Sequence, residues 1–154
     1  MAIDYTWTNI YVGDDYNNTL VGSVGQDEMY GYGGDDIIVG DYGEDHIDGN
    51  NGNDLLAGAS LEGFYDPEPD IFVFDPDDGN DTITDFTPPS YDWLYPSPGD
   101  QIVLLGGTPE DVGTILASAT TTVTNQTILV YGNTTIGLNG IDQSQVSPDW
   151  FLLA

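Results

Sequence analysis

The sequence predicts an all-β fold in which one turn and one short strand alternate, so that the chain coils into two parallel sheets. Two observations predict it: glycine recurs at every ninth residue over six positions, and an apolar residue keeps a fixed place between these glycines. A third observation concerns charge, because the 154 residues include 27 Asp and Glu but no Lys or Arg. A chain of this length favours one domain.

The repeat is clearest when each nine-residue unit is read from its leading glycine. The leading residues are Gly13, Gly22, Gly31, Gly40, Gly49 and Gly58. Position four is Gly25, Gly34, Gly43 and Gly52 in the second to fifth units. Position six is Asn18, Asp27, Asp36, Asp45 and Asp54. Such a fixed period indicates a repeat array, whereas a flexible Gly/Asp-rich linker would not hold several columns in register.

Position eight supplies the core of the predicted coil. It is occupied by Leu20, Met29, Ile38, Ile47 and Leu56, and Tyr11 lies one period earlier. The middle side chain of a short extended segment points to the opposite face from its neighbours. Because successive strands alternate between the sheets, we expect the inward ladders Tyr11–Met29–Ile47 and Leu20–Ile38–Leu56. Positions seven and nine then face outward, which predicts a solvated position for His46.

The charge balance limits what the chain can bind. With a formal net charge of −27 and no Lys or Arg, its carboxylates have almost no cationic side chain to pair with and repel one another. Nucleic acid and anionic membrane are excluded as partners on charge grounds. We expect no membrane insertion and no N-terminal signal peptide, because no long apolar run exists and residues 1–12 lack a basic region. The compensating charge must come from outside the chain, and metal cations are its natural source.

Stacked turns bring the carboxylates and peptide carbonyls of units n and n+2 around a shared gap. These hard oxygen donors suit Ca²⁺, while Mg²⁺ demands stricter octahedral geometry and softer metals prefer other ligands. The expected pairs are Asp27/Asp45, Asp36/Asp54 and Asp45/Asp70, with Asn18/Asp36 as a weaker pair. We therefore predict calcium as the cofactor, with about four to six ions.

The units resemble the GGxGxDxUx nonapeptide of the RTX (repeats-in-toxin) family, closely over about residues 13–58. The first unit departs from that pattern, with Tyr16 in place of Gly and Asn18 in place of Asp. The resemblance implies a right-handed parallel β-roll with Ca²⁺ in its turns. The metal-binding positions that it implies are Asp27, Asp36, Asp45, Asp54, Asp70, Asn18, Gly25, Gly34, Gly43, Gly52, Gly31, Gly40, Gly49, Tyr32, Asp41 and Asn50.

The period breaks after Gly58. We expect a lead-in strand over residues 1–12, repeats over 13–74 with an insertion at 59–69, and a cap over 75–154. Within the repeats, Asp70 and Phe72 fit positions six and eight of a sixth unit. Asp75 to Gly79 begins somewhat like an EF-hand loop, but its glycine is one place early and no flanking helices are evident. A further calcium site in the cap could use Asp77, Asp78, Asp81, Asp85 and Asp100.

The cap contains the best helix signal in the chain. Thr108 fits the N-cap, Pro109 fits N1 and Asp111 fits N3, so a short helix should begin there. Strand-like runs follow at residues 120–124, 127–131 and 135–138, and a final turn at 147–149 leads into the apolar run 150–153. This ending resembles the cap and the uncleaved C-terminal export signal of RTX proteins secreted by type I apparatus. The resemblance implies an extracellular protein of a Gram-negative-type bacterium, with that apparatus as a partner.

The expected function is a calcium-binding structural module that folds on binding calcium after export. We expect no enzymatic activity, because no GxSxG or HExxH motif occurs, although a glycosidase-like carboxylate pair stays open among so many acids. The alternative is an extracellular carbohydrate-binding or surface-binding module. It would use the proline-flanked loop 88–96, whose aromatic residues Tyr91, Trp93 and Tyr95 could stack on the sugar rings of an uncharged polysaccharide. The alternative is that these three residues pack over the roll as a lid on its core.

Overall fold

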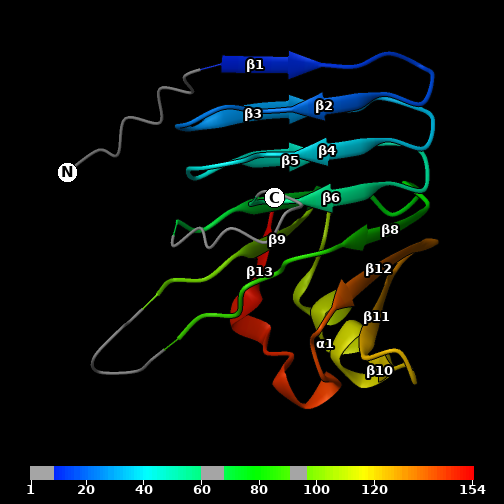
Figure 1. Cartoon of the computed structure of the whole chain (residues 1–154). Coiled ribbons are helices and arrows are strands. Elements are labelled where there is room, and N and C mark those ends of the chain that lie inside the picture. The colour runs from blue at the N-terminus through cyan, green and yellow to red at the C-terminus, as the bar shows by residue number, and fades with distance from the viewer. Residues whose placement is uncertain (1–8, 60–67, 91–96) are drawn as a thin grey trace.

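The computed structural model describes residues 9–59, 68–90 and 97–154. The chain coils through a stack of short strands and ends in a cap that contains the α-helix (Figure 1). The strands are β1 (Asn9–Val12), β2 (Thr19–Val21), β3 (Asp27–Tyr30), β4 (Ile37–Val39), β5 (His46–Asp48), β6 (Leu55–Ala57), β7 (Ile71–Phe74), β8 (Asn80–Ile83), β9 (Gln101–Leu104), β10 (Thr120–Thr121), β11 (Gln126–Tyr131), β12 (Thr134–Asn139) and β13 (Phe151–Leu153). The helices are α1 (Pro109–Ser118) and the 3₁₀ segments η1 (Gln143–Gln145) and η2 (Pro148–Trp150).

The strands form two sheets, and successive strands of the coil alternate between them. One sheet has the order β1-β3-β5-β7-β9-β13 and is parallel throughout. The other has the order β10-β11-β12-β8-β6-β4-β2 and is parallel except where β10, β11 and β12 pair antiparallel. The prediction of an all-β fold with two parallel sheets and one short helix is confirmed. Both sheets continue in parallel register through β8 and β9, beyond the last nine-residue unit.

The core is a pair of side-chain ladders, one inside each sheet. In the first, the register joins Tyr11 to Met29, Ile47, Phe72 and Ile102. In the second it joins Leu20 to Ile38, Leu56 and Ile83. All of these side chains are fully buried except Tyr11 and Leu20, which are partly buried in the first coil. The predicted inward ladders are therefore confirmed, including Phe72 as the sixth-unit member.

The expectation for the outward positions was only partly right. Val39 and Ala57, at position nine, are buried, and His46, at position seven, is half-buried beside the ring of Tyr30, at 6.3 Å between centroids. Neighbouring coils stand only about 4.8 Å apart, so the side chains of one outward rank can shield one another. Burial also lowers the pKa of His46, which is therefore not the solvated histidine that the pattern predicted.

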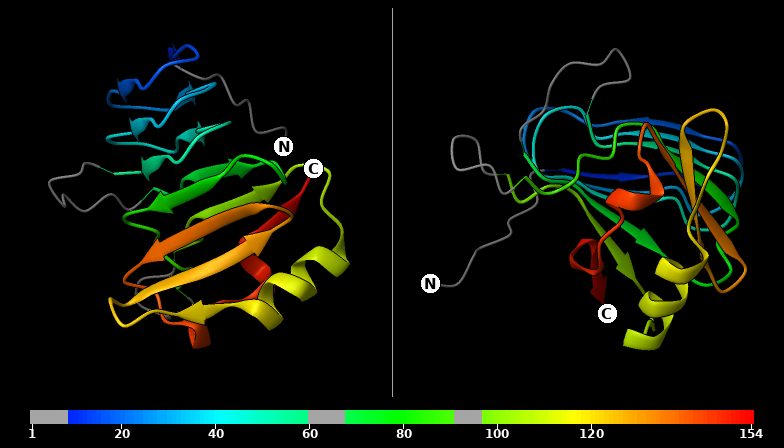
Figure 2. Two further views of the ribbon diagram at one scale, coloured as in Figure 1. Left: turned by 90° about the vertical axis from the view of Figure 1, so that its right-hand side faces the viewer. Right: turned by 90° about the horizontal axis from the view of Figure 1, so that it is seen from below.

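The cap closes the end of the stack that lies opposite β1 (Figure 2). Helix α1 begins at the predicted capping box, in which the Thr108 hydroxyl accepts a hydrogen bond from Asp111 N and the Asp111 carboxylate accepts one from Thr108 N. Its residues Val112 and Ile115 are buried in the core. In the described ranges, no helix has the length and apolar character needed to cross a membrane.

The apolar C-terminal run forms the last strand of the first sheet. β13 pairs parallel with β9, and the carbonyl of Ala154 accepts a hydrogen bond from Gly106 N at 2.6 Å. Immediately before this strand, Trp150 is buried, with its ring 5.1 Å from that of Phe86. These residues therefore have a structural role in the cap, and their use as an export signal stays a prediction.

Truncating one ladder side chain should destabilise the calcium-loaded fold. Ile47→Ala removes a fully buried side chain, and we expect a loss of about 2–5 kcal/mol in the free energy of unfolding. The matched control is Ile10→Ala on β1, whose side chain is 64% exposed, with an expected change within about 0.5 kcal/mol. Urea unfolding in saturating calcium measures both. Equal effects of the two substitutions would contradict the assigned core.

Candidate metal centre

The position-six side chains form two ladders, one along each turn edge of the coil. In each ladder a carboxylate oxygen Oδ1 accepts a hydrogen bond from the backbone N–H of the position-six residue one coil earlier. Before the first sheet, the bonds are Asp27 N to Asp45 at 2.9 Å, Asp45 N to Asp70 at 2.9 Å and Asp70 N to Asp100 at 3.0 Å. Before the second sheet, they are Asn18 N to Asp36 at 2.6 Å, Asp36 N to Asp54 at 2.8 Å and Asp54 N to Asp81 at 2.9 Å.

The second oxygen of several ladder carboxylates has no such partner. The Oδ2 atoms of Asp36, Asp54 and Asp81 are buried and accept no hydrogen bond. By contrast, Oδ2 of Asp27, near the N-terminal end, accepts a hydrogen bond from Ser23 N at 2.6 Å. A buried carboxylate oxygen without a partner is costly, and native proteins rarely keep one unless an ion or water meets it.

The leading glycines let backbone oxygens approach these carboxylates. A Cβ atom on Gly31 would collide with Oδ2 of Asp36 and with the carbonyl oxygen of Gly49, one coil further on. The same holds at Gly40, where the collision would be with Oδ2 of Asp45 and the carbonyl oxygen of Gly58. Carboxylate and carbonyl oxygens of adjacent coils therefore converge at the leading glycine, which is the arrangement that a cation-binding turn requires.

In several units the residue at position two has a left-handed backbone conformation although it is not glycine. Its φ angles are +75° at Tyr32, +84° at Asp41 and +58° at Asn50. An L-residue in this region costs roughly 1–2 kcal/mol relative to glycine. The nonapeptide pattern has Gly at this position, and its replacement indicates strain that the stacked turns hold in place.

Burial changes the acidity of the ladder carboxyls. It raises the pKa of Asp36 above its ordinary value of 3.8, that of Asp54 to about 6 and that of Asp81 to about 7. It likewise raises the pKa of Asp78, which lies near Asp54 and Asp81, to about 7. In each case desolvation disfavours the charged form, and the neighbouring carboxylates add repulsion. A bound cation would supply the missing favourable interaction with the charged form.

The donor set fits calcium provided that the backbone contributes. Among the described residues, no three acidic or histidine side chains gather closely enough to hold an ion without other ligands. Each gap between coils does bring a carboxylate such as Asp36 close to a peptide carbonyl such as that of Gly49. Oxygen donors alone, in a turn that tolerates variable geometry, are what Ca²⁺ takes.

The five acids predicted as a separate site in the cap divide between the two edges. Asp81 and Asp100 continue the ladders described above. Asp85 accepts hydrogen bonds from Gly58 N at 3.1 Å and Ala59 N at 2.9 Å, and Asp78 accepts one from Asp75 N at 2.5 Å. Asp77 is exposed and accepts one from the Asn133 amide at 2.6 Å. Of the other predicted site residues, Tyr91, Trp93 and Tyr95 lie outside the described residues.

A third ladder, at position five, was not predicted. Along the edge before the second sheet, the Asn17 side chain accepts a hydrogen bond from Asp35 N, the Asp35 carboxylate accepts two from Asn53, and the chain of bonds continues to Asn80 and Thr135. The hydrogen bonds from Asn53 lower the pKa of Asp35. Asn17, Asp35 and Asn53 stand 18 residues apart, so comparing every second unit would have revealed this column.

A family model described as the RTX calcium-binding nonapeptide repeat (4 copies) matches residues 12–43 and 30–60. These residues belong to the RTX repeat family. The family model therefore identifies residues 12–60 as calcium-binding RTX repeats, and the turns between Gly13 and Gly58 lie within this stretch. No curated protein sequence matches the chain.

Two solved structures resemble the chain as a whole. One is the extracellular lipase LipA from Serratia marcescens, with a TM-score of 0.65 and 21% identity, covering 94% of this chain and 21% of the lipase chain. The other is the AlgE6R3 subunit of the mannuronan C5-epimerase from Azotobacter vinelandii, with a TM-score of 0.63 and 24% identity, covering 91% of this chain and 80% of that subunit. At these identities the likeness establishes the β-roll fold. The chain thus spans about a fifth of the length of the lipase that it matches.

Relieving the strained backbone should stabilise the roll. Tyr32→Gly allows the left-handed φ at no steric cost, and we expect a gain of about 1 kcal/mol in the calcium-loaded protein. Tyr16→Gly is the matched control, since Tyr16 is an exposed turn residue of the same edge without a positive φ. Urea unfolding in saturating calcium measures both. If Tyr32→Gly and Tyr16→Gly destabilised the protein equally, the backbone at Tyr32 would not be strained.

Acid should favour the metal-free fold. The pKa values of Asp54 and Asp81 are raised in the fold to about 6 and about 7, above the ordinary value of 3.8. Their contribution to stability is therefore fully present below about pH 4 and is lost as the pH rises through 6 and 7. In EDTA, far-UV circular dichroism should show more β-structure at pH 5.0 than at pH 7.5, with light scattering as the check for aggregation. A soluble chain that is less structured at pH 5.0 would contradict this.

Proposed function

We propose that the chain is a structural module that is unfolded without calcium and folds when several Ca²⁺ ions bind between its coils. The observation that carries the proposal is the set of buried, unpartnered Oδ2 atoms of Asp36, Asp54 and Asp81. The chain contains no Lys or Arg that could meet them. In this proposal calcium is the missing partner, and the module needs no catalytic activity of its own.

Each ion would bind between two adjacent coils of one edge. Its ligands would be the position-six carboxylates together with carbonyl oxygens at positions one, two and four. The Oδ1 hydrogen bonds join six pairs of adjacent position-six residues, and one of these pairs contains Asn18 in place of a carboxylate. This supports an expected load of about four to six ions.

The energy of binding is large enough to decide whether the chain folds. Binding sites that do not exist in the unfolded chain convert metal affinity into folding free energy. Each site at 100 times its dissociation constant adds roughly 2.7 kcal/mol, so four sites add roughly 11 kcal/mol. That sum is comparable with the whole stability of an ordinary domain, roughly 5–15 kcal/mol. Without ions, the formal charge of −27 opposes compaction.

The proposal extends to where the chain folds. The cytosol keeps free calcium low, so the chain would stay unfolded inside the cell and fold in calcium-rich surroundings outside it. We propose that it is secreted by a type I apparatus, which would recognise the apolar C-terminal run before β13 forms. The match to the repeat family and the similarity to the extracellular lipase LipA support this route.

Circular dichroism at pH 7.5 tests the proposal. We expect a largely unfolded spectrum in EDTA and a β-rich spectrum in millimolar calcium, with about four to six ions per chain by native mass spectrometry. Asp54→Asn should reduce the ion count and raise the calcium concentration needed for half-folding severalfold, since Asp54 belongs to two adjacent pairs. Asp15→Asn is the control, because Asp15 is an exposed acid outside both ladders.

Two results would contradict the proposal. One is a fully structured spectrum in excess EDTA at pH 7.5. The other is an unchanged ion count and midpoint in Asp54→Asn, because the ladder carboxylates would then not be ligands.

A further inference from the structure

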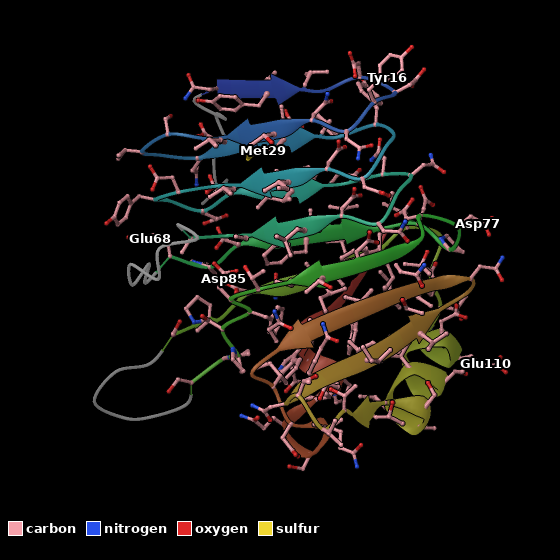
Figure 3. All side chains as sticks on the ribbon, turned by 45° about the vertical axis from the view of Figure 1, so that its right-hand side comes forward. Tyr16, Met29, Glu68, Asp77, Asp85 and Glu110 are labelled. Atoms are coloured by element: carbon pink, nitrogen blue, oxygen red, sulfur yellow. The ribbon has the colours of Figure 1, made fainter. Side chains whose placement is uncertain are left out.

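The two turn edges of the roll differ in how their position-five side chains are used. Before the second sheet, Asn17, Asp35 and Asn53 are joined coil to coil by hydrogen bonds, and that edge is closed. Before the first sheet, the corresponding residues are Gln26 and Glu44, and in the described structure neither side chain makes a hydrogen bond. Figure 3 shows the two edges, with Tyr16 and Asp77 on the closed one and Glu68 and Asp85 on the other.

The open edge carries a groove. A cavity of about 490 Å³ is lined by Val24, Gln26, Tyr42 and Glu44, together with Gly25 and Gly43 of the same turns. A second cavity of about 330 Å³, lined by Asp70, Pro98 and Gln101 among others, shares Glu44 with the first, so the two adjoin along the edge. The groove therefore lies on the outside of the turns that would hold calcium. Their combined size is in the range of sites that hold small organic ligands.

The floor of the groove is held rigidly by the roll. The turns that carry Val24 and Tyr42 pair as a parallel bridge, and Gly25 N donates to the carbonyl of Tyr42 at 2.6 Å. The side chains are nevertheless available, since Val24 is 76% exposed and Tyr42 is 39% exposed. The groove therefore presents preformed apolar surfaces without needing a change in the backbone.

The chemistry of the groove selects a class of ligand. Tyr42, Val24 and Pro98 offer apolar faces, the amides of Gln26 and Gln101 both donate and accept, and the Glu44 carboxylate accepts. An anionic polymer would find no Lys or Arg anywhere in the chain and would be repelled by its net charge of −27. A cationic ligand would be attracted to acids over the whole surface and would have no preference for this edge. Apolar faces beside amides instead suit a neutral molecule with many hydroxyls.

We propose that this groove binds an uncharged oligosaccharide, with a sugar ring stacked on Tyr42 and its hydroxyls bonded to Gln26, Glu44 and Gln101. Such a ring has an apolar C–H face and a rim of hydroxyls, and an exposed aromatic residue is amphipathic in the same way. The groove exists only in the folded roll, so the proposal rests on calcium-dependent folding. It uses the described edge residues and needs nothing from loop 88–96.

The test is binding of the calcium-loaded chain to an array of uncharged glucose, mannose and galactose oligosaccharides, followed by calorimetry with the best binder. Circular dichroism of the same sample confirms folding, so that a failure to fold is not mistaken for a failure to bind. We expect binding of at least one oligosaccharide, with Tyr42→Ala weakening it at least tenfold and Gln26→Ala severalfold. Tyr16→Ala, an exposed tyrosine on the closed edge, should bind within twofold of the unaltered chain.

Three results would overturn the proposal. The first is no binding to any uncharged oligosaccharide by a chain that circular dichroism shows to be folded. The second is binding that Tyr42→Ala and Gln26→Ala leave unchanged. The third is binding of an oligolysine peptide that Tyr42→Ala abolishes while no oligosaccharide binds, because the groove would then be a site for basic segments.

Discussion

The constraint on which the whole structure depends is the burial of carboxylates in a chain that has almost no cationic side chain to meet them. Asp36, Asp54 and Asp81 each bond one oxygen to the backbone of the preceding coil and leave the other buried and unpartnered. Removal from water raises the pKa of Asp54 and Asp81 and makes their charged forms costly. In our proposal a cation between the coils removes that cost, so that folding and ion binding form one equilibrium.

The same carboxylates also determine how the coils depend on one another. Each inner ladder residue donates its N–H to the next coil and accepts from the previous one, so adjacent coils share a hydrogen bond and, in our proposal, an ion. Stability should then be transmitted between nearest neighbours, as in other repeat proteins. At the N-terminal end the ladders finish with amides: Asn9 donates to Asp27 at 2.8 Å, and Asn18 donates to Asp14 at 3.1 Å. These neutral side chains end the array without requiring a further ion.

Much of the fold could be predicted from the sequence, because the nine-residue period predicts the coil directly. The inward ladders through Met29 and Ile38 and the capping box at Thr108 follow from local spacing and hydrogen-bonding chemistry. Where extra residues are inserted between coils, the sequence spacing no longer shows which residues are partners in a ladder. Asp81 and Asp100 lie 27 and 30 residues from their ladder partners instead of 18, so they were assigned to a separate site.

Other features cannot be predicted from the residue type at each position of the repeat, because they depend on how the coils stack. The left-handed backbone at Tyr32 is set by the stacking of turns, and it contradicts the preference of a tyrosine. The position-five ladder is an exception, because comparing every second unit of the sequence reveals its column, since odd and even units lie on different edges. His46 is likewise half-buried because the outward-facing side chains of adjacent coils shield one another.

A crystal structure of the calcium-loaded chain, with the ions located by anomalous scattering, would show directly whether calcium meets the buried carboxylates. We expect ions between adjacent coils, within coordination distance of the Oδ2 atoms of Asp36, Asp54 and Asp81. Ions found only on surface acids, with those three oxygens still buried and unpartnered, would contradict this expectation.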